Sequence, residues 1–205
     1  MLRASIRLAA IALVLGFLVG DSLADREPEV VASPAQRASV PSSTEIATRS
    51  IPYADSPQPA HLGIPAIDVA TNIRPVGNSD ATTMQVPGDI RVVGWYDRSA
   101  LPISTAGNTV LVGHRDGAED PNGVFRHLGS VREDDRIQVS DIAGRTVEYS
   151  VVQVALLSDE QFAQRAERIF RRGGRHRLVL ITCGGEYDPN RGGYQANVVV
   201  TAKRA

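Results

Sequence analysis

From residue 61 onward the chain alternates short apolar runs with glycine, proline and aspartate. Val, Ile and Thr dominate these runs, which is typical of β-strands bounded by turns. We expect strands at residues 62–67, 90–96, 109–112, 136–140, 146–154, 178–182 and 197–201. The segment Asp141-Ile142-Ala143-Gly144, between two of these runs, predicts a hairpin.

One segment has helical rather than strand periodicity. Ser158 and Gln161 match a capping box, and apolar residues then follow at helical spacing, which predicts a helix over residues 159–170. A shorter helical turn is expected at residues 123–128. Because strands and helices do not alternate along the chain, we expect a mainly β fold with a closed or sandwiched, antiparallel-rich sheet.

The first 24 residues have the pattern of an export signal. Arg3 and Arg7 precede an uninterrupted run of apolar and small residues from Leu8 to Gly20. Such a run is shorter than the roughly 20 apolar residues of a membrane helix, and Ser22-Leu23-Ala24 resembles a small-x-small cleavage site. We interpret residues 1–24 as a signal peptide or a membrane anchor. Either one directs the rest of the chain to the outer face of the membrane.

Residues 25–60 are rich in Pro, Ser, Thr and Ala and lack any sustained apolar period, which predicts a flexible linker. Residues 61–205 are long enough for one domain with its own core. The net charge of −1 gives no electrostatic reason to expect a nucleic-acid partner.

The chain has a single cysteine, Cys183, so no intrachain disulfide can form. It directly follows the strand predicted at 178–182, and His114 likewise follows the strand predicted at 109–112. A thiol and an imidazole at neighbouring strand ends can transfer an acyl group, because the thiolate attacks a carbonyl and the imidazolium protonates the leaving amine. A lone buried cysteine is otherwise a small apolar residue.

Several motifs, in this order, resemble the sortases, the cysteine transpeptidases on the outer face of Gram-positive membranes. They are Leu62-Gly63-Ile64-Pro65-Ala66-Ile67-Asp68-Val69, Met84-Gln85-Val86-Pro87, Val93-Gly94-Trp95-Tyr96, Gly113-His114-Arg115-Asp116 and Thr182-Cys183-Gly184-Gly185. The resemblance covers most of the chain beyond His61 and is strongest to the actinobacterial class E and F branches, with the Cys-Gly-Gly form favouring class F.

The resemblance implies an eight-stranded sortase β-barrel with one or two short helices. It implies that Cys183 is the nucleophile and His114 the general acid and base. The reaction would cleave a secreted protein after the Thr of an LPxTG-like sorting motif. The acyl group would then pass to an amine of a peptidoglycan precursor or a pilin.

Sortases also use an arginine, commonly on the last strand. Here Asn197 aligns with that position, and the nearest arginine is Arg191 in the preceding loop. We assign the role to Arg191, with Asn197 as an alternative oxyanion donor and Arg115, beside His114, as a third candidate. Thr182, Trp95 and Asn197 are the predicted substrate-binding residues, although Trp95 also suits the barrel core.

The spacing of His61, His127 and His176 matches no zinc-ligand pattern, so we expect no metal and no cofactor. Two other functions compete with the sortase interpretation. An L,D-transpeptidase would place a Gly-Cys-x-Arg pattern around its thiol, whereas Cys183 lies between Thr182 and Gly184. The second alternative is a binding or structural β module with an incidental thiol.

Overall fold

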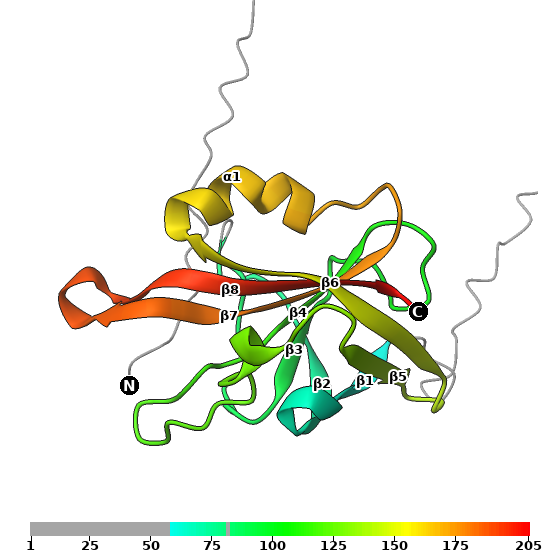
Figure 1. Cartoon of the computed structure of the whole chain (residues 1–205), viewed down its shortest axis with the longest axis horizontal. Helices are drawn as coiled ribbons and strands as arrows, with labels where there is room; N and C mark the ends of the chain where they lie inside the picture. Colours follow the sequence, from blue (N-terminus) through cyan, green and yellow to red (C-terminus); the bar gives the residue numbers. More distant parts are fainter. Residues whose placement is uncertain (1–57, 81–82) are drawn as a thin grey trace, which may run out of the picture. The chain divides into compact units, whose positions relative to one another are not determined.

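The strands of the described residues close into a barrel with the hydrogen-bonded order β1-β2-β3-β4-β7-β8-β6-β5 (Figure 1). The computed structural model describes residues 58–80 and 83–205, which belong to one compact unit. The strands are β1 (Pro59–Ile64), β2 (Val69–Val76), β3 (Val93–Tyr96), β4 (Asn108–Val112), β5 (Arg136–Asp141), β6 (Thr146–Ser158), β7 (Arg177–Asp188) and β8 (Gly193–Arg204). The expected mainly β, eight-stranded barrel is therefore confirmed.

Most neighbouring strands run antiparallel, and two pairs are parallel. These are β2 with β3 and β4 with β7. The second pair matters most here, because it sets the carboxyl end of β4 against the middle of β7, just before Cys183. In β4 and β7 the last paired residues are Val112 and Ile181.

Strand alternation divides the apolar residues into two clusters. Leu178 and Leu180 of β7 point into the barrel, where they join Leu111, Phe125 and Tyr149 in the interior core. The intervening residues point outward and form a second cluster, the outer cluster. Its buried members are Val76, Met84, Val110, Val112, Leu157, Phe162, Ile169, Val179, Ile181 and Val199.

The helix α1 (Asp159–Ile169) covers the outer cluster with Phe162 and Ile169. Its predicted capping box is confirmed, because the Ser158 hydroxyl accepts from the Gln161 amide at 3.2 Å and the Gln161 side chain accepts from the Ser158 amide at 3.1 Å. The turn expected at 123–128 is a run of turns over 124–127 followed by the 3-10 turn η3 (Leu128–Ser130). Two further 3-10 turns are η2 (Pro65–Ile67) and η4 (Pro189–Arg191).

Strands β7 and β8 extend well past the ends predicted for them at 182 and 197. They form a long hairpin that projects from the barrel and turns at η4 (Figure 1). A register shift between Gly184 and Tyr187 interrupts the pairing, and Gly185 has a positive φ of 76° there. The shift marks a bulge, which lets the strand continue through the Gly-Gly pair. The prediction that Cys183 follows the end of its strand is therefore wrong.

The expected signal segment and most of the expected linker fall in residues 1–57, outside the described residues. Strand β1 begins at Pro59, close to the expected start of the domain. Within 58–80 and 83–205, no helix combines the length and apolarity needed to span a membrane.

Candidate active site

Cys183 lies in β7, directly opposite Asn197 of β8. Its side chain is half-buried and packs against the outer cluster, on the side of the sheet that α1 covers. The position follows from alternation, because Val179 and Ile181 precede Cys183 on the same face of β7.

The parallel pairing of β4 with β7 brings the backbone of His114 alongside the part of β7 that carries Cys183. After the last pair, Val112 with Ile181, the Gly113 amide still donates to the Ile181 carbonyl at 3.1 Å. His114 and Cys183 each lie two residues beyond that pair, on backbones that are about 4.8 Å apart where they are paired. The structure thus brings the backbones of the predicted nucleophile and the predicted acid and base together where β4 ends against β7.

Two glycines fix the backbone around His114. A Cβ on Gly113 would lie 2.6 Å from the Phe125 ring, and one on Gly123 would lie 2.4 Å from the His114 carbonyl oxygen. Both separations are shorter than carbon contacts allow. The Phe125 amide donates to that same carbonyl at 2.8 Å. The Gly-His motif therefore owes its glycine to the buried Phe125 ring.

The His114 ring is oriented by a backbone carbonyl. Its Nε2 lies 2.7 Å from the Pro87 carbonyl oxygen. A carbonyl only accepts, so Nε2 carries a proton and Nδ1 is the basic nitrogen of the neutral ring. The Met84–Pro87 segment that supplies this carbonyl is anchored in the outer cluster by Met84 and Val86.

The surroundings of Cys183 favour the neutral thiol. Burial raises the pKa of Cys183, the carboxylates of Asp116 and Asp159 raise it further, and the Arg115 guanidinium lowers it. The thiol is therefore protonated at neutral pH. A base is needed when it attacks, and the Nδ1 of His114 is suited to that task.

The predicted arginine does not lie near the thiol. Arg191 is in η4, at the exposed turn of the hairpin. Five residues of β7 separate Cys183 from the start of that turn. At about 3.3 Å per residue that stretch spans roughly 16 Å. Arg115 is closer, because its charge acts on Cys183, but its Cζ lies over the Tyr194 ring, 5.2 Å from the centroid.

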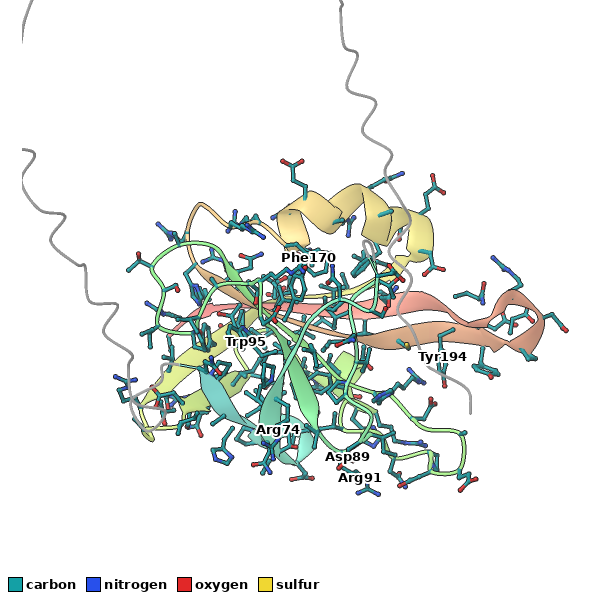
Figure 2. The ribbon with its side chains drawn as sticks, turned by 180° about the vertical axis from the view of Figure 1, so that it is seen from behind. Arg74, Asp89, Arg91, Trp95, Phe170 and Tyr194 are labelled. Carbon is teal, nitrogen blue, oxygen red and sulfur yellow. The ribbon has the colours of Figure 1, made fainter. Side chains whose placement is uncertain are left out.

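The three predicted substrate-binding residues are not on one face. Thr182 is 1% exposed, and alternation directs its side chain into the barrel, away from Cys183. Trp95 belongs to the interior core, where Figure 2 shows it amid the strands, so it does not line a groove at the thiol. Asn197 alone shares the face of Cys183. Among the described residues, no group of three or more His, Cys, Asp or Glu side chains could hold a metal ion.

A comparison with protein-family models shows which family the chain belongs to. The Sortase domain matches residues 62–205, which is most of the chain and all of the strands from β2 onward. The chain belongs to the sortase family. Sortases are cysteine transpeptidases, so an enzyme rather than a binding module is confirmed.

Solved sortases share this fold at low sequence identity. Sortase C-1 from Actinomyces oris is 24% identical over 71% of this chain and 71% of its own, with a TM-score of 0.55. Sortase A from Corynebacterium diphtheriae is 24% identical over 72% of this chain and 60% of its own, with a TM-score of 0.54. Sortase C1 of GBS Pilus Island 1 is 23% identical over 71% and 63%, with a TM-score of 0.53. No curated protein sequence matches significantly.

Two contributors to this sortase site were not predicted. Asp159, the first residue of α1, accepts a hydrogen bond from the Asn197 side chain at 3.4 Å. The Pro87 carbonyl orients His114. The capping box located Asp159 at the start of the helix, but its meeting with β8 depends on how the helix packs. A backbone carbonyl has no side-chain signature in a sequence.

Proposed function

We propose that this sortase acts outside the membrane, cleaving secreted proteins at an LPxTG-like motif and transferring them to a cell-wall or pilin amine. The observation that supports the proposal is that Cys183 lies in β7 and His114 lies two residues beyond the end of β4, the strand that pairs with β7 in parallel. Within the family, the Met-Gln-Val-Pro motif favours the class E and F branches, and the Cys-Gly-Gly motif favours class F.

The chemistry takes two steps. His114 Nδ1 removes the Cys183 proton, and the sulfur attacks the carbonyl carbon of the motif threonine. When the tetrahedral intermediate collapses, the C–N bond breaks and the imidazolium gives its proton to the leaving amine. An incoming amine then attacks the thioester, His114 takes the amine proton, and the Cys183 thiolate leaves. The same imidazole thus acts as base and then acid in the first half and as base in the second, after which the imidazolium returns its proton to the Cys183 thiolate.

The proposed location outside the membrane and the proposed amine acceptor are supported by different observations. The export pattern of Arg3, Arg7 and the apolar run to Gly20 supports action beyond the membrane, with those arginines on the cytoplasmic side. The match to a sortase C1 of a pilus island supports a pilin amine as one acceptor class. Peptidoglycan amines are the other.

The test is a transfer assay with the full-length protein in detergent. A small library of LPxTG-like peptides is incubated with the protein and either a diamino-acid stem peptide or a pilin-derived lysine peptide. Mass spectrometry should find peptides cut after Thr and joined to one of the amines, and no product with Cys183→Ala. Cleavage elsewhere, or product formed by Cys183→Ala, would contradict the proposal.

A further inference from the structure

The side chain that faces Cys183 across the sheet is that of Asn197. The two residues are directly paired in the β7–β8 register, so their side chains share a face, with Cβ atoms about 4.5–5.5 Å apart. Asn197 is only 6% exposed. A buried carboxamide of this kind is costly unless its polar atoms have partners.

One partner of Asn197 is Asp159. The Asn197 Nδ2 donates to Asp159 Oδ1 at 3.4 Å. A carboxamide nitrogen carries two N–H groups, and within 58–80 and 83–205 the Nδ2 of Asn197 has Asp159 as its acceptor, so the second N–H can donate elsewhere. Asp159 is held in turn at the first position of α1, next to the capped Ser158. The amide orientation is therefore set by a carboxylate on a fixed element.

The two arginines considered for the same role, Arg191 and Arg115, do not face the Cys183 thiol. Arg191 lies at the hairpin turn, roughly 16 Å along β7 from the thiol. Arg115 stacks on Tyr194, which is labelled near the hairpin in Figure 2. The Tyr194 hydroxyl also donates a hydrogen bond to Asp116. Tyr194 is three residues before Asn197 in β8, so alternation places its ring on the opposite face of the strand.

We propose that Asn197, positioned by Asp159, is the oxyanion donor of this sortase, in the place where other members use an arginine. The inference rests on the proposed function. As the Cys183 sulfur bonds to the carbonyl carbon, the carbonyl π electrons move to oxygen, and the free Asn197 N–H donates to that oxygen. A donor must lie about 2.7–3.1 Å from the oxyanion, and an oxygen held between two opposed side chains of one sheet face meets this condition.

The carboxylates near the thiol oppose a negative oxygen, so stabilisation of the oxyanion requires a hydrogen-bond donor. Asp116 and Asp159 already act on the thiol, and Arg115 opposes them only in part. The site therefore stabilises the oxyanion through a hydrogen bond rather than through a full positive charge. This predicts that activity depends on the N–H group itself and is insensitive to removal of the Arg191 charge.

The experiment measures single-turnover acylation of the full-length protein by a cleavable sorting peptide, using intact mass. Asn197→Ala should slow acylation by about 10²–10³-fold, with a smaller change in the peptide concentration at half-maximal rate. Asn197→Leu has a side chain of similar shape without the donor, and residue 197 is paired with Leu157 of β6, so this variant should fold and show the same loss. Arg191→Ala is the matched control and should acylate at the wild-type rate.

Asp159 is tested as a positioning residue. Asp159→Ala should slow acylation, and Asp159→Asn, which retains an accepting oxygen, should restore it. The inference is overturned if both Asn197 variants, folded by thermal unfolding, acylate within threefold of wild type, or if Arg191→Ala loses as much as they do. A wild-type protein that is acylated by none of the peptides contradicts the proposed function instead.

Discussion

A buried histidine at the other end of the barrel makes stability depend on acid pH. His176 is 4% exposed and its Nε2 lies 3.0 Å from the Tyr149 hydroxyl, which donates to the Pro102 carbonyl at 3.0 Å. The Tyr149 oxygen therefore accepts from Nε2–H. The Nδ1 of the same ring is buried and has no hydrogen-bond partner among the residues that the structure describes. In the folded protein the imidazole of His176 is therefore neutral, and a proton added to its Nδ1 would create a buried positive charge.

Burial lowers the pKa of His176 to about 4, the Arg204 guanidinium acts in the same direction, and the backbone of Ala106 and Gly107 acts against them. In the unfolded chain the pKa is about 6.5. Between these values the unfolded state binds more protons, so stability is complete above pH 6.5 and falls as the pH drops toward 4. Each unit between the two pKa values is worth about 1.36 kcal/mol, so at pH 4 the loss is about 3 kcal/mol.

The assay is urea unfolding of wild type and His176→Gln at pH 7 and pH 4. Glutamine does not titrate, so the stability advantage of wild type over the variant should shrink by about 3 kcal/mol between the two pH values. His127→Gln, at an exposed histidine, is the control and should track wild type. If the difference in unfolding free energy between wild type and His176→Gln changes by less than about 0.5 kcal/mol, which is comparable to the experimental error, the reasoning is refuted.

Two further predictions concern the active site. Gly123→Ala places a Cβ 2.4 Å from the His114 carbonyl oxygen, so peptide acylation should fall by about 10²-fold through displacement of the imidazole; Gly173→Ala, with nothing within 4 Å, should leave the rate unchanged. Because burial first, and then Asp116 and Asp159, raise the pKa of Cys183, its alkylation by iodoacetamide should reach half its maximal rate above the free-thiol value of about 8.5. Asp116→Asn should move that midpoint to lower pH, and an unchanged midpoint would contradict the assigned cause.

Periodicity predicted most strands and α1, because buried Val and Ile runs carry a clear signal. It missed β2, where Arg74 and Pro75 interrupt the apolar pattern and only Ile73 and Val76 are buried. It also ended β7 too early. Gly184-Gly185 reads as a turn, but the positive φ of Gly185 is used inside a bulge of a continuing strand.

The sequence predicted which backbone segments meet at the candidate site better than it predicted where their side chains point. The motifs drew attention to Cys183 and His114. Strand alternation would have predicted that the Thr182 side chain points into the barrel, because the adjacent Cys183 points outward. The pairing of Cys183 with Asn197 depends on the length of the hairpin, which the bulge changes by one residue. Arg191 was assigned by its distance along the chain, and an extended hairpin moves such a residue away from the thiol.

The central claim is that Cys183 and His114 act as a pair in acyl transfer, and the mass of the trapped intermediate tests it most directly. After a short incubation of full-length protein with a cleavable sorting peptide, proteolytic mapping should locate the acyl group on Cys183. The rate of its formation should drop by at least about 10² in His114→Ala, since a positioned acid and base contributes that much. An acyl group on any other residue, or equal rates in the two proteins, would contradict the account.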